Sequence, residues 1–492
     1  MTLETALAWS IGRSLVVTTL ALPMSLVVWR LISANQQSGR IHSLLAIAAL
    51  LPLFVPDLLT GFTYRMTSAR LIHSELATEV LYAVLLLFRI FALQVAARMI
   101  LPSSTVSAEA LYSWKLVQDR SASWWFSWLR LHVQGSLRTP LIAWIGGALF
   151  CFQEFETGAL LQIDRHPITW SVWLFDAHAA GEPLSRSLMF VSEATVFQIV
   201  LLLPIILLLP RRGLQISKGT GSVLAAKGGP AVLTSAACIL FAAFGTFIIW
   251  PLLSNGIGAL SGLRALTGHG NVTQRIQLFL TGRSDLVLRS YQIVSSVVPA
   301  TIASAAALQL AIGIRSFGRQ WLTVLTVVPG LCGSLVVSLT LLAVFQLSWL
   351  NAVYDSWLPM IVASTLLMLP RALLLVVLLE VLSPPTSIHS AGLLRAGGGT
   401  AAVHGRNLIW QLVRVRWLIS TVVLAHWCLW DVAVASTLRP VRFEPIVVRL
   451  YNEMHYGRTE TLAAITLLAL VIPAGLICIV AIMWKQLPQR DS

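Results

Sequence analysis

The 492-residue sequence has few charged residues, and those it has are spread unevenly along the chain. Asp, Glu, Lys and Arg together make up 11% of the residues, whereas 57% are hydrophobic and the mean hydropathy is +0.80. A soluble globular protein is far less apolar than this. The charge is mainly basic, with 34 Lys and Arg against 20 Asp and Glu, but it lies between long apolar runs. We therefore expect a protein embedded in a lipid bilayer and no nucleic-acid partner.

Cysteine motifs, metal-ligand spacings and nucleotide-binding motifs are also missing. The five cysteines are widely spaced, lie in or beside apolar stretches and form no CxxC pair or Cys/His cluster. We predict that they are small core residues, with no disulfide framework and no metal site. The sequence contains no Walker A pattern, Gly-x(4)-Gly-Lys-Ser/Thr. We expect no bound cofactor and, because no dense cluster of His and Asp is present, no enzymatic activity.

Long apolar runs are abundant, and about eleven of them are long enough to cross a membrane as helices. They predict an all-α polytopic fold with spans near Leu7–Leu31, Ile41–Thr63, Ala77–Ile100, Pro140–Leu161, Leu188–Leu209, Ala231–Leu253, Ser290–Ile314, Trp321–Leu347, Leu358–Leu382, Leu418–Leu438 and Leu462–Trp484. With the N-terminus outside, all four lysines and most arginines fall on the inner side. The predicted location is a bacterial inner membrane, with the C-terminus in the cytoplasm.

The sequence also contains an internal repeat. Three pairs of residues at equivalent places lie 277 positions apart: Ser121 and Gly398, Gln134 and Gln411, and Glu154 and Asp431. The stretch from Val172 to Gly181 matches Val448 to Gly457 at 276 positions, and Pro56-Asp57-Leu58 resembles Pro329-Gly330-Leu331. Matches in the same order along the chain indicate two duplicated halves of parallel topology.

A basic segment rich in Gly and Ser separates the predicted halves. It predicts a first half at 1–212 with about five spans, a cytoplasmic linker at 213–230 and a second half at 231–492 with about six spans. Each half has one long inner loop, at 102–139 and at 383–417. In the first loop, residues 119–133 place Trp124, Trp128 and Leu131 on one helical face. Such a helix either docks a soluble partner or anchors on lipid.

This layout resembles the permease subunits of binding-protein-dependent ABC importers, most closely the fused two-half permeases of the ferric-iron and thiamine type. The resemblance covers nearly the whole chain but rests on layout, because the signature residues of the inner loop are degenerate. Lys115 and Gly392 stand where the family has Glu, Ser121 replaces one Gly, and Gly398 keeps the other. The resemblance implies that the two loops contact separate cytoplasmic ATPase subunits through Lys115, Ser121, Ala122, Trp128, Gly392, Gly398 and Trp410. It also implies an extracytoplasmic substrate-binding protein.

Three carboxylates lie within predicted spans and are candidates for the translocation path. Glu154 and Glu156 in the first half and Asp431 in the second lie in equivalent predicted helices. Because burial of an ionisable group in a membrane costs free energy, such residues are candidates for a functional role. They would suit a cation or cationic solute. Alternatively, they cap loops or pair with outer arginines such as Arg165 and Arg439.

Three functions stay open on the sequence alone. An ATP-driven importer, with ferric iron, thiamine or a polyamine as substrate, fits the repeat and the paired loops. An ion-coupled secondary transporter would use the three carboxylates to bind its coupling cation. A membrane-embedded enzyme acting on lipids or glycans is the third, although Glu154-x-Glu156 alone is weak support for catalysis.

Overall fold

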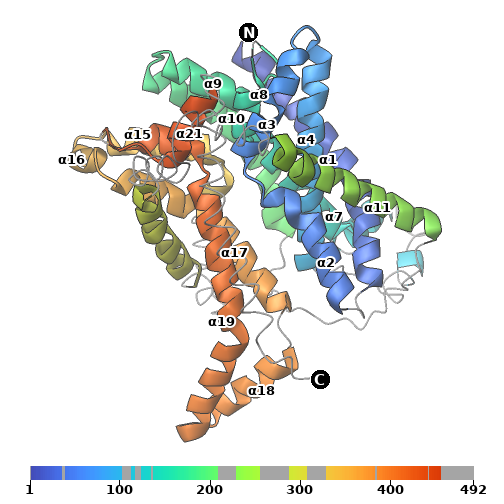
Figure 1. Ribbon diagram of the computed structural model, residues 1–492. Coiled ribbons are helices and arrows are strands. Elements are labelled where there is room, and N and C mark those ends of the chain that lie inside the picture. Colours follow the sequence, from blue (N-terminus) through green and yellow to red (C-terminus); the bar gives the residue numbers. More distant parts are fainter. Residues whose placement is uncertain are drawn as a thin grey trace, which may run out of the picture. The chain divides into compact units, whose positions relative to one another are not determined.

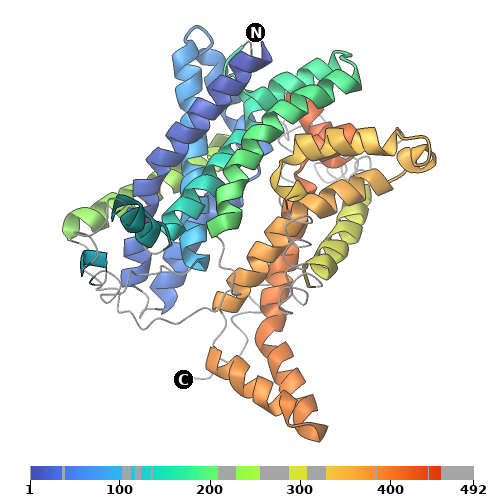
Figure 2. The ribbon, with the colours of Figure 1, turned by 180° about the vertical axis from the view of Figure 1, so that it is seen from behind.

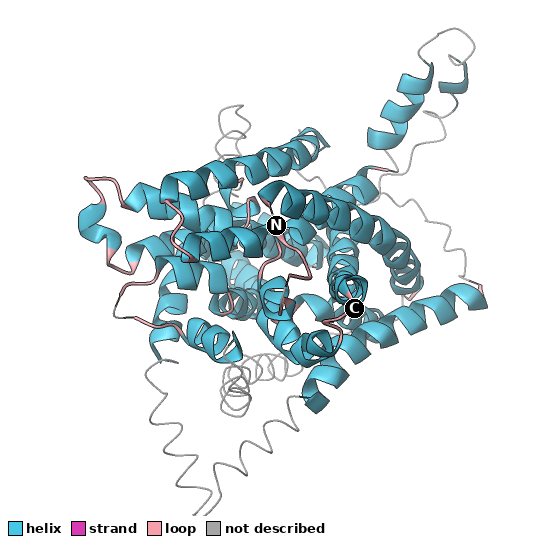
Figure 3. Ribbon diagram, turned by 90° about the horizontal axis from the view of Figure 1, so that it is seen from above, coloured by secondary structure: helices cyan, strands magenta, loops and turns pink. Residues whose placement is uncertain are grey.

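The computed structural model describes residues 2–35, 39–101, 112, 114–116, 124–134, 137–163, 165–208, 229–254, 288–306, 328–382, 385–441 and 443–455. Within these ranges every regular element is a helix and none is a strand (Figure 3). The chain forms two compact units, residues 1–254 and 255–492. The all-α fold predicted from the sequence is therefore confirmed for the described residues.

The first unit is built around three long helices. Helices α1, α4 and α7 contact one another, and α11 contacts α1 (Figure 1). The elements are α1 (Leu3–Ala34), α2 (Gly39–Leu50), the 3₁₀ turn η1 (Leu51–Leu53), α3 (Asp57–Arg70), α4 (Glu75–Ile100), α6 (Trp124–Gln134), α7 (Arg138–Gln153), α8 (Glu156–Leu161), α9 (Trp170–Ala179), α10 (Leu184–Leu208), α11 (Pro230–Phe244) and the π-helical turn η2 (Gly245–Ile249).

The second unit contains a helix at 288–306 and a set of elements at its C-terminal side. Figure 2 shows these helices, yellow to red, from behind. They are the 3₁₀ turn η3 (Pro329–Leu331), α15 (Ser334–Phe345), α16 (Asn351–Tyr354), α17 (Leu358–Leu382), α18 (Pro385–Ala396), α19 (Gly399–Leu429), α20 (Val432–Leu438) and α21 (Ile446–His455).

Four described helices are long and apolar enough to span a membrane, at Leu3–Ala34, Glu75–Met99, Leu184–Pro204 and Pro230–Ser254. Two bent helix pairs raise the number to six if each pair forms one span: Leu44–Leu53 with Asp57–Arg70, and Ser420–Leu429 with Val432–Leu438. The chain is thus an all-α membrane protein with four to six candidate spans. The eleven spans remain a prediction, because the last one and parts of the seventh and eighth lie outside the described residues.

Small residues and buried polar groups hold the first unit together. Gly147 on α7 lies so close to α4 and α1 that an added Cβ would stand 2.9 Å from Ile90 and 3.0 Å from Thr18. The Gln94 side-chain amide donates to the Thr18 carbonyl at 3.0 Å, a bond between α4 and α1 that is fully buried. Close backbone approach and interhelical hydrogen bonds are the interactions that join helices in a bilayer, where apolar burial against lipid contributes little.

The division into compact units differs from the predicted linker. Helix α11, which the sequence assigns to the start of the second half, contacts α1 and α2 within the first unit. Most of residues 213–230 lie outside the described ranges. Spatial contact and sequence repeat are separate criteria, and the two duplicated halves stay a prediction.

Candidate functional site: two helix breaks with a buried carboxylate

Glu154 lies at a break between two helices of the first unit. Helix α7 ends at Gln153 and α8 begins at Glu156, so Glu154 has extended backbone and its side chain caps α8. The carboxylate accepts the backbone N–H groups of Thr157 and Gly158, the latter at 3.2 Å. It also accepts the Tyr82 hydroxyl of α4. With Glu154 only 6% exposed, these three donors replace the water that the carboxylate loses on burial.

Arg89 supplies positive charge next to this break. The guanidinium forms a buried ion pair with Asp57 at the start of α3 and donates to the Val55 carbonyl at 2.9 Å. It also interacts electrostatically with Glu154 and Glu156. Glu156 is half-buried in the first turn of α8.

Asp431 lies at the corresponding break of the second unit. Helix α19 ends at Leu429 and α20 begins at Val432, and one Asp431 carboxylate oxygen accepts the Val434 N–H at 3.1 Å. This is its only hydrogen bond among the described residues, although Asp431 is just 9% exposed. Arg371 of α17 interacts with it electrostatically. The Arg371 guanidinium lies 5.9 Å from the Trp427 ring, outside ion-pair distance of Asp431.

A serine on an early helix supports each break. In the first unit, Trp170 opens the ten-residue helix α9 and donates its backbone N–H to Ser10 Oγ of α1 at 3.0 Å. In the second, Ile446 opens the ten-residue helix α21 and donates to Ser290 Oγ at 2.8 Å. Both ten-residue helices follow a carboxylate-capped helix. The two breaks thus have similar local structure; Trp170 and Ile446 lie 276 positions apart, and Ser10 and Ser290 lie 280 positions apart.

One proposed match in the repeat needs correction. The sequence paired Pro56 with Pro329, but Pro56 precedes the longer helix α3, whereas Pro329 opens the 3₁₀ turn η3. The 3₁₀ turn of the first unit contains Pro52 instead. Pairing these two turns places α3 and α15, which begin at 57 and 334, at the same 277-residue spacing as Glu154 and Asp431.

The sequence left a structural alternative for the three carboxylates, in which they cap loops or pair with outer arginines. Glu154 and Asp431 each cap a helix, as that alternative expected, and Glu156 lies in the first turn of α8. Neither Glu154 nor Asp431 pairs with Arg165 or Arg439, since Arg439 lies 3.9 Å from Glu444. Capping explains why a carboxylate is tolerated at this depth. A place on the translocation path remains a prediction for all three.

The two long loops contain helices of different kinds. In the first loop, Lys115 is exposed, and α6 places Trp128 half-buried, stacked on Trp125 at 5.1 Å. Ser121 and Ala122 lie outside the described residues. The helix α6 also exposes apolar side chains, with Trp125 52%, Phe126 72% and Leu129 38% exposed. The contacts favour neither of the two roles predicted for this helix, lipid anchor or docking surface.

In the second loop, α18 folds back on α19 as a helical hairpin (Figure 1). Gly398 and Gly399 make the turn with φ values of +73° and +53°, which residues other than glycine rarely adopt. Gly405 allows the contact, because an added Cβ would lie 2.5 Å from the Arg395 backbone nitrogen. Gly392 is on α18, and Trp410 on α19 is 60% exposed. The hairpin thus presents Trp410 on its surface.

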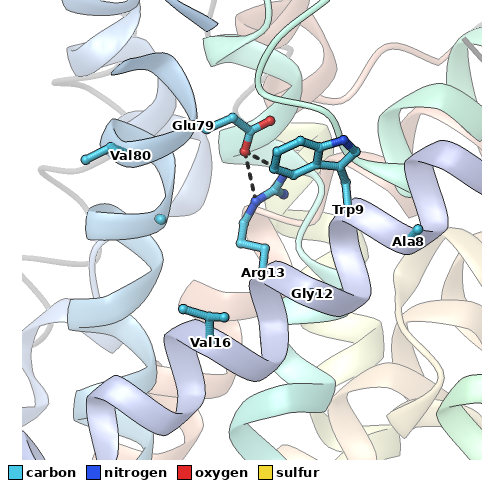
Figure 4. Close-up of a pocket in the computed structure, with 8 residues that line it drawn as sticks. Ala8, Trp9, Gly12, Arg13, Val16, Glu79 and Val80 are labelled. Carbon is cyan, nitrogen blue, oxygen red and sulfur yellow. Dashed lines mark hydrogen bonds and ion pairs between the residues drawn. The ribbon is translucent and has the colours of Figure 1, made fainter. Parts of the chain in front are cut away.

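A separate open groove of about 480 Å³ runs between α1 and α4. Figure 4 shows Arg13 reaching from α1 toward Glu79 of α4, with Trp9 beside them. The ion pair measures 2.9 Å, and Glu79 also accepts the Ile168 N–H at 2.7 Å. The remaining lining is small or apolar. Arg13 and Glu79 tie the loop before α9 to both long helices, and so this groove has a structural role.

Sequence reasoning missed Tyr82, Arg13 and Ser364, all of which lie near the two breaks. Tyr82 bonds to Glu154, Arg13 lies over the Tyr82 ring at 4.6 Å, and Ser364 faces Asp431 across a cavity. Extending the repeat to α4 and α17 would have identified the Tyr82 position, because Arg89 and Arg371 lie 282 residues apart, as do Tyr82 and Ser364.

The cysteines and the other candidate ligands carry no site. Cys151, Cys332 and Cys428 are buried, as predicted, whereas Cys238 is exposed on α11 and Cys478 lies outside the described residues. No group of three or more His, Cys, Asp or Glu able to hold a metal occurs in the part of the chain that the structure describes. Comparison with family models, with curated proteins and with solved structures gave no match.

Proposed function

We propose that the chain is the transmembrane permease subunit of an ATP-driven importer. Two halves would form the solute path, and two separate cytoplasmic ATPase subunits would drive them between outward and inward states. An extracytoplasmic binding protein would deliver the solute. The observation that carries the proposal is the pair of similar breaks, in which a capping carboxylate, a short helix and a ten-residue helix recur at spacings of 276 or 277 residues. Duplicated halves with broken helices are typical of transporters.

The helical hairpin of the second loop supports a coupling role. It carries Arg395, Arg406 and Arg414 and exposes Trp410, and no Asp or Glu occurs between Glu380 and Asp431. Such a basic surface with an exposed aromatic side chain suits a soluble partner. In this proposal Gly392, Gly398 and Trp410 contact one ATPase, and Lys115, Ser121, Ala122 and Trp128 contact the other. ATP is bound by those partners.

Affinity purification of the full chain from its own membranes tests the proposal. We expect an ATPase and a binding protein to co-purify, and solute uptake to stop when cellular ATP is depleted. Recovery of the chain alone from cells that make both proteins would contradict it. The matched variant is Gly398→Val, which should lose the ATPase while the chain still inserts in the membrane.

Asp431 favours a second candidate, an ion-coupled secondary transporter. One of its carboxylate oxygens has no hydrogen-bond donor among the described residues and is available to a cation. Uptake that survives ATP depletion and collapses with the ion gradient would support this candidate and exclude the importer. Ferric iron, thiamine and polyamines remain the proposed solutes of the importer.

A further inference from the structure

A small cavity adjoins Asp431 in the second unit. It has a volume of about 30 Å³ and is lined by residues of five segments of the second unit, among them Ser290, Ile293, Ser364, Cys428, Asp431 and Val434. A cavity of about 10–15 Å³ is enough for one water molecule. The space therefore fits one small polar group next to the carboxylate.

The cavity exists because a serine stands where the first unit has a tyrosine. Tyr82 and Ser364 are each seven residues before the arginine of their helix, Arg89 and Arg371. The Tyr82 ring fills the space beside Glu154, and its hydroxyl donates to that carboxylate. The side chain of Ser364 is much shorter. It lines the cavity beside Asp431 and forms a hydrogen bond with the Cys428 thiol. The second unit thus lacks both the ring and the donor.

Asp431 consequently has unused capacity to accept hydrogen bonds. Glu154 receives three donors, whereas Asp431 receives one, and both are more than nine-tenths buried. The carboxylate lines the cavity, so a group inside it can supply a further donor. Arg371 does not fill this role. Its guanidinium is directed toward Met368 Sδ at 3.8 Å and is not among the residues that line the cavity.

We propose that the cavity beside Asp431 binds an ammonium group, which donates to the carboxylate as the Tyr82 hydroxyl donates to Glu154. The ammonium is either a free small amine or the end of a larger amine solute. The inference rests on the transport function and narrows its solute to an amine, but binding is measurable without transport.

Cys428 provides a reporter, because its thiol lines the same cavity. In a full-length variant that keeps Cys428 as the sole cysteine, 2-aminoethyl methanethiosulfonate should label the thiol, with labelling followed by mass spectrometry. Ammonium, methylammonium and putrescine should each slow labelling by about tenfold or more at saturation. Tetramethylammonium, which has no N–H donor, should not.

Ser364→Tyr tests the origin of the cavity, and Ser364→Ala is its matched control. Tyrosine should fill the space as Tyr82 does and slow labelling by about tenfold or more. Alanine removes the hydroxyl that bonds to the Cys428 thiol but keeps the cavity, so methylammonium should slow labelling of the alanine variant, relative to its own unprotected rate, by the same factor as in the parent. Equal labelling of the tyrosine variant and its parent would overturn the proposal. So would protection by Na⁺ as strong as that by ammonium, because a bare cation donates no hydrogen bond.

Thermal stability in detergent gives an independent measurement that does not depend on reagent access to the thiol. Ammonium or methylammonium should raise the Tm of the wild-type chain and not that of Asp431→Asn. Equal shifts in the two chains, or none, would overturn the proposal. If the chain binds amines but uptake depends neither on ATP nor on an ion gradient, the proposed binding site is supported and the proposed transport function is contradicted.

Discussion

The two helix breaks share a backbone design and differ in the side chains around it. Both place a carboxylate at the start of a short helix, and both anchor the next helix through a serine hydroxyl. Around Glu154, Tyr82 and Arg89 satisfy the charge, whereas Asp431 has one donor and a cavity. Two breaks with similar backbone structure can therefore differ in their polar surroundings.

The second arginine shows the same contrast. Arg89 is held by an ion pair with Asp57 and by the Val55 carbonyl. At the position of Asp57 the second unit has Ser334, and no ion pair of Arg371 is found among the described residues. Arg371 contacts Met368 Sδ and the Trp427 ring and interacts electrostatically with Asp431 and Cys428. At the first break, the charged groups contact one another and nearby polar groups. At the second break, a cavity beside Asp431 leaves space for a ligand.

Gly330→Ala should break the second unit most severely. An alanine Cβ would lie 2.2 Å from the Leu366 carbonyl oxygen and 2.8 Å from the Pro370 ring, so η3 and α17 would have to separate. Overpacking against backbone costs about 3 kcal/mol or more. We expect loss of monodisperse protein in size-exclusion chromatography. Gly146→Ala is the control, because no atom lies within 4 Å of its added Cβ, and equal loss in both variants would contradict the argument.

Asp57→Ala should damage the first break next most strongly. It leaves Arg89, which is 3% exposed, without its ion pair, and removing one partner of a buried pair costs about 3–5 kcal/mol. The measurement is the Tm in detergent. The double variant Asp57→Ala with Arg89→Leu should recover most of the loss. Ser334→Ala at the equivalent position should change the Tm little, and a similar drop there would remove the contrast between the units.

How far the sequence predicts these features depends on how local they are. The repeat, the helix with Glu154 and the helix with Asp431 follow from spacing and hydropathy, because they depend on neighbours along the chain. The Tyr82 bond to Glu154, the ion pair of Arg89 and the cavity at Ser364 join residues on different helices. Their pairing depends on how α4 and α17 rotate in the core, which hydropathy does not determine. The hairpin turn at Gly398 was not predicted, because the family pattern identified only the glycine.

Tyr82→Phe should make the first break more like the second. The phenyl ring keeps the packing, but Glu154 loses its hydroxyl donor, and a hydrogen bond to a charged group contributes about 1.5–3 kcal/mol. We therefore expect the Tm of Tyr82→Phe to decrease. Tyr64→Phe is the comparison, because the Tyr64 hydroxyl donates to a neutral group, the Thr246 carbonyl, at 3.0 Å. An equal decrease in both would indicate that the charge of Glu154 is not involved.

Gly398→Val should have the smallest effect on folding and a large effect on coupling. Its φ of +73° disfavours valine by about 1–2 kcal/mol, which opens the α18–α19 turn without touching the membrane helices. Gly397→Ala is the control, since the nearest atom to its added Cβ is the Leu394 carbonyl oxygen at 3.5 Å, an ordinary contact, and Gly397 is not among the proposed ATPase contacts. We expect ATP-dependent uptake to fall in the first variant and persist in the second, at equal membrane levels. Because the first loop contains α6 and this one a hairpin, unchanged uptake in Gly398→Val would shift the proposed coupling role to the first loop.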